Sequence, residues 1–359
     1  MGLFFVLLLV PLSIQHLVVK KEHMGFEKKN KYALLFFFVF LTLLVMLRHE
    51  SVGTDTRNYI FFFREFSVMG WGDLTKNTIE YGFSYFNKIV SLISTEPQFF
   101  LAVVALAVCA MIYPTYRRLC EDASLTIVIF CTMSTFAMMF SGLRQMLAIG
   151  IGFIAYEFTR RKKPVFFILA VMFAMLFHTS AFILVFMYPL YHARITRKWL
   201  LAVVPVLVAI FIFNKQIFTF LAEILERYTE YDGEIAMTGA YTMLILFIVF
   251  TVFAFLIPDE ARLDSETVGL RNLLLLALAL QMFAPLHTLA MRMNYYYIIF
   301  IPLLMPKIIK YRSERWGQVA IVARHVMVIF FFVYFFYNAY ASDSSLNVFP
   351  YSFFWENAA

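Results

Sequence analysis

Residues 32–47 read YALLFFFVFLTLLVML, and residues 48–59, which follow directly, read RHESVGTDTRNY. The first segment carries no charge and is apolar enough to enter a bilayer, whereas the second contains six ionisable side chains and a glycine. This change predicts that the second segment emerges at a membrane surface. Charge beside hydrocarbon often marks a functional site, the alternative being a solvated loop anchored by Arg48.

The composition places the whole chain in the same class. Hydrophobic residues make up 62% of the 359 residues, and only 15% are charged, which is too little polar surface for a soluble globule. The net charge of +7 indicates no nucleic acid partner, because the Lys and Arg residues gather in short loops as they do at the cytoplasmic face of membrane proteins. We therefore expect a polytopic membrane protein embedded in the lipid bilayer.

The apolar runs predict an all-α bundle of about twelve transmembrane segments, some of them short or broken. We expect one integral membrane domain over residues 1–359, since no repeat or linker divides the chain. The runs cover residues 2–19, 32–47, 98–116, 124–140, 145–159, 164–177, 179–192, 199–213, 239–257, 271–286, 293–306 and 317–339.

The basic clusters predict the topology. They all fall on the cytoplasmic side only if residues 165–191 form two short helices broken near His178, because one helix of that length would span about 40 Å and invert the next loop. Both termini and two loops, residues 48–97 and 214–238, then face outward, and the second loop is expected to hold an interfacial helix. The clusters are Lys20 to Lys31, Arg117 to Arg118, Arg160 to Lys163, Arg194 to Lys198 and Lys307 to Arg315.

Polar residues interrupt the apolar runs at two further points on the predicted outer side. The segment SGLRQ, residues 141–145, opens a helix whose N-terminus points outward, and Arg144 adds a forked cation there, so an anion site is expected. The alternative is an interfacial Arg behind a serine cap. His178 lies at the predicted hairpin break, where the hydrogen-bonding groups of the non-helical backbone need protein or water as partners. The alternative is that His178 is a structural histidine.

Two more features lie on the same side. Arg292 begins a further inward-running helix in MRMNYYY, where the alternative is an anchor beside an aromatic belt. Glu80 opens EYGFSYFN, residues 80–87, and most such acids are simply solvated. Cys109, Cys120 and Cys131 have neither the spacing nor the histidine partners of a disulfide framework or a zinc site.

These groups together suit chemistry on a lipid-linked diphosphate, because the cationic and carboxylate side chains are expected to be accessible both from the lipid and from the water outside. We expect the diphosphate to be held by Arg144, Arg292, Arg48 and Arg57. The sugar contacts are predicted at Tyr59, Tyr81, Gln145 and Tyr295. The candidate bases are His178, Asp55 and Glu80.

His178 ranks first among the bases because imidazole titrates near neutral pH, with an ordinary pKa of about 6.5. Asp55 is flanked by Arg48 and Arg57, which favour its ionised form and make it a weak base. We expect no metal and no cofactor to be required, since the outer loops contain no DxD motif.

The ordered set LRHESVGTDTRNY, EYGFSYFN, SGLRQMLAIGIGF and FHTSAF resembles the EpsG family of Wzy-like polysaccharide polymerases. The similarity runs from Met1 to Tyr191, and beyond it rests on hydropathy and on Arg292 followed by tyrosines. The resemblance implies polymerisation of undecaprenyl diphosphate-linked oligosaccharide units into exopolysaccharide, capsule or O-antigen chains. The site would face outward from the bacterial cytoplasmic membrane, with a chain-length regulator and a flippase of the same pathway as possible partners.

Two alternatives use the same features. A glycan ligase or another integral-membrane glycosyltransferase would share the diphosphate chemistry and differ in the acceptor. A polysaccharide flippase or transporter would need a continuous polar path across the midplane. The predicted spans have almost no charge there, with Arg324 near the inner end of the last span as the exception, which disfavours transport.

Overall fold

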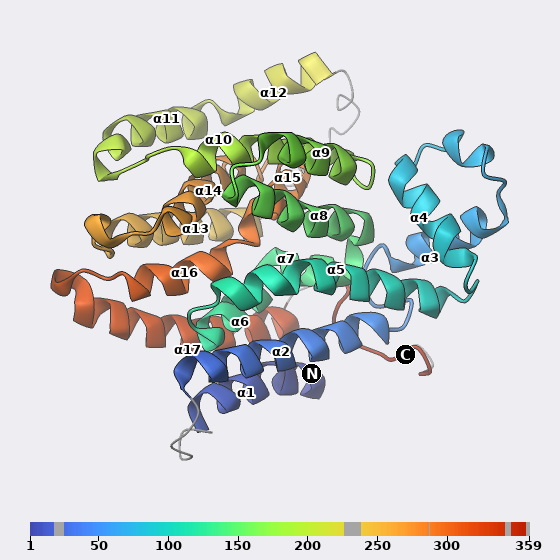
Figure 1. The fold of residues 1–359 in the computed structure, drawn as a ribbon, viewed down its shortest axis with the longest axis horizontal. Coiled ribbons are helices and arrows are strands. Elements are labelled where there is room, and N and C mark those ends of the chain that lie inside the picture. Colours follow the sequence, from blue (N-terminus) through green and yellow to red (C-terminus); the bar gives the residue numbers. More distant parts are fainter. Residues whose placement is uncertain (18–24, 226–237, 287, 342–345, 357–359) are drawn as a thin grey trace. The chain divides into compact units, whose positions relative to one another are not determined.

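The chain is described by a computed structural model that covers residues 1–17, 25–225, 238–286, 288–341 and 346–356. Within these ranges the regular elements are all helices, as the sequence predicts (Figure 1). Two compact units are present: residues 1–185 together with 322–359 form unit 1, and residues 186–321 form unit 2. The expectation of a single membrane domain stays a prediction.

Unit 1 contains the spans predicted first along the chain and both described chain ends. Its helices are α1 (Gly2–Leu17), α2 (Phe26–Met46), α3 (Thr56–Val68), α4 (Tyr81–Ser91), α5 (Pro97–Leu119), α6 (Ala123–Thr132), α7 (Ser134–Ser141), α8 (Leu143–Arg160), α9 (Pro164–Met175) and most of α17 (Gly317–Ala341). The predicted outer loop of residues 48–97 is thus largely helical, because α3 and α4 lie within it.

The directions of the helices in unit 1 are fixed by contacts at their ends. Gln98 at the start of α5 donates to the carbonyl of Met46 at the end of α2, so these two helices are antiparallel. Arg118 at the end of α5 pairs with Glu157 near the end of α8 at 2.6 Å, so α5 and α8 are parallel. Three predicted cytoplasmic clusters therefore share one end of unit 1: Lys28 to Lys31, Arg117 to Arg118 and Arg160 to Lys163. Which face of the membrane this end meets stays a prediction.

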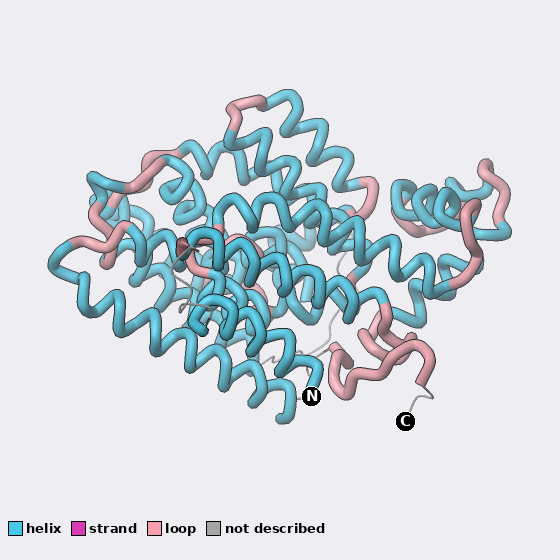
Figure 2. Tube along the Cα trace, turned by 60° about the horizontal axis from the view of Figure 1, so that its bottom comes forward, coloured by secondary structure: helices cyan, strands magenta, loops and turns pink. Residues whose placement is uncertain are grey.

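Both chain ends lie at the opposite end of unit 1. The ring of Phe4 in α1 is 4.6 Å from that of Phe349, and the Tyr351 hydroxyl donates to the Leu44 carbonyl at 2.9 Å. Figure 2 draws the C-terminal segment as a loop that lies beside this end of the helices. The shared side predicted for the two termini is thus found within unit 1.

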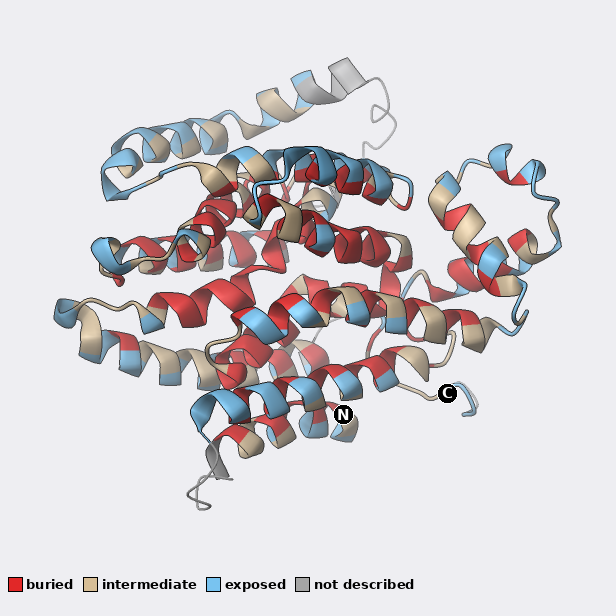
Figure 3. Cartoon of the chain, in the orientation of Figure 1, coloured by how far each residue is buried: buried red, intermediate tan, exposed pale blue. Residues whose placement is uncertain are grey.

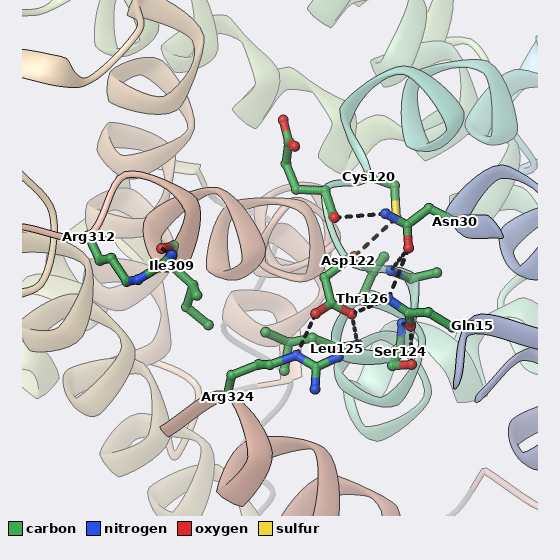
Figure 4. A network of polar contacts seen from close by, with 12 residues as sticks. Gln15, Asn30, Cys120, Asp122, Ser124, Leu125, Thr126, Ile309, Arg312 and Arg324 are labelled. Carbon is green, nitrogen blue, oxygen red and sulfur yellow. Dashed lines mark hydrogen bonds and ion pairs between the residues drawn. The ribbon is translucent and has the colours of Figure 1, made fainter. Parts of the chain in front are cut away.

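A polar network ties the basic end together (Figure 4). Asp122, which caps α6, accepts from Gln15 of α1 at 3.1 Å and from Arg324 of α17 at 2.6 Å. Asn30 of α2 joins it through Gln15 at 3.0 Å. Arg324, the predicted exception among the uncharged midplane residues, is therefore paired in an ion pair whose two side chains are each 14% exposed.

The predicted break near His178 is confirmed. The helix α9 ends at Met175, residues 179–186 form a 3-10 helix, and α10 covers Met187–His192. No single continuous helix therefore spans this stretch.

The predicted number of spans is wrong. Among the described residues, three helices are long and apolar enough to cross a membrane, or up to five if each bent pair forms one span. The apolar runs were counted without their bends: α6 and α7 meet at 65°, and several runs form helices of 10–17 residues, shorter than a bilayer requires. The run 293–306 is divided between α15 (Thr288–Ile298) and α16 (Ile301–Lys310).

Unit 2 is built around α14 (Ser265–Gln281). Its other helices are α10, α11 (Leu200–Ile212), α12 (Asn214–Leu225), α13 (Thr238–Leu256), α15 and α16. A helix is found in the loop 214–238 as α12 up to Leu225, and its interfacial position stays a prediction. Residues 226–237 lie outside the described residues. Arg271, fully buried, pairs with Glu260 at 2.6 Å and joins α14 to the turn before it.

The exposed surface matches a lipid environment. Large apolar side chains point outward along α9 and α17, with Val165 68% and Phe330 50% exposed. By contrast α8 is buried along most of its length, as Figure 3 shows. Exposed hydrocarbon along helices is stable in lipid but not in water, so the fold is that of a helical membrane protein.

Candidate active site

Glu80 joins three segments that are far apart in the sequence. Its Oε2 accepts from Arg144 Nη1 at 2.5 Å, and its Oε1 lies 3.1 Å from His178 Nδ1. The backbone N–H of Thr179 also donates to Oε1, at 3.2 Å. The structure therefore brings together three of the residues that the sequence singles out. Their side chains are 14–24% exposed, so the cluster is largely shielded and still reaches the surface.

Close packing of α4 on the end of α9 places Glu80 there. A Cβ at Gly82 would lie 2.7 Å from the Leu176 carbonyl oxygen, so only glycine allows this approach. One turn later the rings of Phe86 and Phe177 pack edge to face at 6.1 Å. The glycine in EYGFSYFN thus has a structural purpose that the sequence alone did not reveal.

Arg144 lies in the first turn of α8, as predicted, but without the serine cap considered for it. The capping position is Gly142, which offers no side chain, and Ser141 instead ends α7 and accepts the backbone N–H of Asp55 at 3.3 Å. The start of α8 therefore keeps N–H groups that no capping side chain satisfies, and these favour an anion.

Tyr59 completes the surroundings of Arg144. The guanidinium lies 5.9 Å from the centre of the Tyr59 ring, and its positive charge acts on the phenol. Burial raises the pKa of Tyr59, with Arg144 opposing that effect, so the phenol is neutral at physiological pH. Tyr59 was predicted to contact sugar, but at 6% exposure its ring is covered and its evident partner is Arg144.

The charges of the cluster fix the state of Glu80. Burial raises the pKa of Glu80, but the hydrogen bond with His178 and the charges of Arg144 and His178 outweigh it and hold the pKa at about 2. Glu80 is therefore a carboxylate at any physiological pH and a poor base. A carboxylate only accepts hydrogen bonds, so His178 donates through Nδ1 and its Nε2 carries the lone pair when the ring is neutral.

The charged residues of the first outer loop are placed differently from one another. Asp55 precedes α3 without capping it through its side chain. Arg57 is 66% exposed and lies 3.6 Å from Glu50. Arg48 is fully buried, donates to the Val45 carbonyl, and burial lowers its pKa to about 10. A diphosphate would reach Arg48 only if the covering chain moved, so its predicted role loses support.

The remaining candidates stay predictions. Tyr81, next to Glu80, is 52% exposed and is the sugar-binding candidate most open to solvent. Gln145 and Tyr295 are buried. Arg292 belongs to unit 2 and lies in the second turn of α15 instead of beginning the helix, because α15 already starts at Thr288.

The described residues offer no metal centre by the usual donors. Among them, no three His, Cys, Asp or Glu side chains lie close enough together to hold an ion. The three cysteines are free thiols.

The fold and the cluster together define a helical integral membrane protein with a shielded ionic site at one end of its first unit. The model of the EpsG family matches residues 31–353, nearly the whole chain, and the protein belongs to that family. The match includes the C-terminal half, where the sequence resemblance was weakest. No curated protein and no solved structure matches the chain.

Proposed function

We propose that this protein polymerises lipid-linked oligosaccharide repeat units at the outer face of the bacterial cytoplasmic membrane. The lipid carrier is taken to be undecaprenyl diphosphate, and the product an exopolysaccharide, capsule or O-antigen chain. Membership of the EpsG family supports this assignment. The observation that carries it is the contact of Glu80 with both Arg144 and His178, because it sets a cation and an oriented imidazole side by side.

The proposed reaction is a glycosyl transfer. A sugar hydroxyl of the incoming unit attacks the anomeric carbon of the growing glycan, and a new carbon–oxygen bond forms. The bond between that carbon and the lipid diphosphate breaks, and its electron pair leaves with the diphosphate. The proton of the hydroxyl must go to a base, and the negative charge that grows on the leaving group must be stabilised.

His178 is the proposed base. Glu80 holds Nδ1, so Nε2 faces the acceptor with its lone pair, and the carboxylate stabilises the imidazolium that forms. Glu80 is thereby a positioning residue for His178, which differs from its predicted role as a candidate base.

Arg144 is the proposed partner of the leaving diphosphate. Its Nη1 is used by Glu80, and its buried Nε makes no hydrogen bond among the described residues. The side chain is 24% exposed, and a planar, partly exposed guanidinium at the start of α8 suits a phosphate oxygen. Arg57, Arg292 and a chain-length regulator or flippase are further proposed participants that await direct tests.

The test is polymerisation by the purified protein. A defined undecaprenyl diphosphate-linked repeat unit should yield a ladder of longer glycans, and His178→Ala should abolish the ladder while the unit accumulates. His325→Ala, an exposed histidine of α17, is the matched control and should leave the ladder intact.

The outcomes separate the alternatives. A wild-type protein that transfers one glycan to a different acceptor without a ladder is a ligase. One that moves the unit across a vesicle membrane without forming a bond is a transporter. A normal ladder from His178→Ala would remove His178 as the base.

A further inference from the structure

Residues 53–55, Gly-Thr-Asp, contact the break between α7 and α8, which precedes Arg144 by only a few residues. Gly53 has φ +91°, and a Cβ there would lie 2.2 Å from the Phe140 carbonyl oxygen. A side chain is therefore excluded both by the backbone conformation and by the contact. The backbone N–H of Asp55 donates to Ser141 at 3.3 Å in the same place.

Thr56 forms the side-chain part of this contact. It is fully buried, and its hydroxyl lies 2.7 Å from the Val52 carbonyl oxygen and 3.2 Å from that of Phe140. The hydroxyl has one proton, which the two carbonyls share. Thr56 thus links the loop before α3 to the last turn of α7.

Thr56 and Tyr59 lie one helical turn apart on α3. Thr56 contacts the chain just before α8, and Tyr59 contacts Arg144 in the first turn of α8. The first turn of α3 therefore holds the α7–α8 break on both sides. The residue at the break, Gly142, has no side chain of its own to cap α8.

The C-terminal segment, residues 346–356, fastens the other side of the same loop through its backbone. The N–H of Gly53 donates to Asn347 and that of Thr54 to Leu346, both at 2.9 Å. Earlier in the loop, the N–H of His49 donates to Ser352 at 2.8 Å. The last described residues of the chain thus contact the loop that holds the start of α8.

We infer that Thr56 is a positioning residue for Arg144, and that the C-terminal segment completes the candidate site by fixing the loop that carries Thr56. The inference rests on the proposed function and deepens it. Thr56 itself touches no substrate; it acts through the start of α8.

The first test compares Thr56→Val with Thr56→Ser. Valine keeps the shape and removes the hydroxyl, and since it leaves a buried carbonyl without its partner, polymerisation should fall by about tenfold. Serine keeps the hydroxyl and should restore most of the activity. Both proteins should be present in the membrane at the wild-type level, measured by immunoblot.

A double-mutant cycle with Arg144→Lys distinguishes positioning from a merely structural role. If Thr56 acts through Arg144, then adding Thr56→Val to Arg144→Lys should reduce the rate little further. If instead the fold-loss in rate of the double variant equals the product of the two single fold-losses, Thr56 acts independently of Arg144, and that result overturns the inference.

The C-terminal segment is tested at Asn347, whose side chain is exposed and whose φ is +55°. Asn347→Pro cannot adopt that angle, whereas Asn347→Gly adopts it freely. The proline variant should lose activity at least as far as Thr56→Val, and the glycine variant should keep it.

The two proposals fail in different ways. If the wild type forms no glycan ladder, the proposed function fails. If the wild type forms one and both Thr56→Val and Asn347→Pro match it, the proposed function stands and the positioning inference is wrong.

Discussion

At the scale of single residues, both carboxylate oxygens of Glu80 are already hydrogen-bonded to neighbouring side chains in the absence of substrate. One carboxylate oxygen pairs with Arg144 and the other with His178. A carboxylate so placed orders both partners, whereas it cannot itself take a proton from a sugar hydroxyl. Its low pKa makes the ion pairs a source of stability that depends on pH in a defined direction.

We expect Glu80→Gln to reveal that dependence. The folded pKa of Glu80, about 2, lies below its ordinary value of 4.5, so the stabilisation is fully present above pH about 4.5 and is lost as pH falls toward 2. The difference in melting temperature between the wild type and Glu80→Gln, measured in detergent, should shrink as pH falls below about 4.5. At neutral pH it should correspond to a stabilisation on the order of 3 kcal/mol. A difference that does not vary with pH down to pH 3 would contradict the assigned ion pairs.

At the scale of elements, glycines decide which helices approach. Gly82 lets α4 contact the end of α9, and Gly53 lets the first outer loop contact the end of α7. Both contacts involve the backbone of the neighbour, which cannot move aside as a flexible side chain does. The position of the cluster is thus set by the absence of two side chains.

Gly82→Ala should separate α4 from α9 and draw Glu80 away from His178. The new Cβ would lie 2.7 Å from the Leu176 carbonyl oxygen and 2.8 Å from its Cβ, closer than such atoms pack. We expect polymerisation to fall by more than about tenfold, a loss that a shift of only 1 Å at a reacting group can cause. Gly72→Ala is the matched control, because no atom lies within 4 Å of its added Cβ. Equal activity of the two variants would show that this contact is not needed.

At the scale of the whole molecule, α1, α2, α6 and α17 are joined at the basic end by the network around Asp122 (Figure 4). Its members come from the beginning, the middle and the end of the sequence. One carboxylate oxygen of Asp122 accepts from Gln15 and from the Leu125 N–H, and the other accepts from Arg324. Both oxygens of Asp122 therefore have partners, and the pair with Arg324 has the features of a structural lock.

Asp122→Asn should weaken that lock. Arg324 would keep its charge without a counter-charge in a largely buried position, and removing one partner of such a pair costs about 3 kcal/mol. We expect a clear drop in melting temperature in detergent. Asp73→Asn, which removes the exposed pair with Lys76, is the control and should cause no measurable change. Equal melting temperatures for Asp122→Asn and the wild type would argue against the lock.

The topology of the membrane protein is tested by cysteine labelling. In a background with the three native cysteines replaced, Thr75→Cys should react with an impermeant reagent added outside the cell, and Lys162→Cys should react only after permeabilisation. Both positions are exposed, Thr75 at the end of a short 3-10 helix and Lys162 in a turn, so neither change disturbs packing. The reverse pattern would invert the orientation and place the candidate site in the cytoplasm.

Several features of the molecule follow from the sequence because they depend on local pattern. Apolar composition determines helices in lipid, and the distribution of Lys and Arg determined which helix ends of unit 1 lie together. The need to keep those clusters on one side also predicted the break near His178. The number of spans was not predictable in this way, because an apolar run does not reveal a bend such as that between α6 and α7.

The candidate site shows the same division. Arg144, His178 and Glu80 were identified from the sequence, because charge beside hydrocarbon is rare and costly. The contacts of the predicted site residues could not be identified in this way. In the structure Glu80 pairs with His178, Tyr59 lies against Arg144, and Arg48 is buried. The sequence by itself determined the class of protein and the residue types of its site, since both are properties of single segments. Only the tertiary structure decided which residues meet, because those contacts depend on close packing between helices and on loops that are distant along the chain.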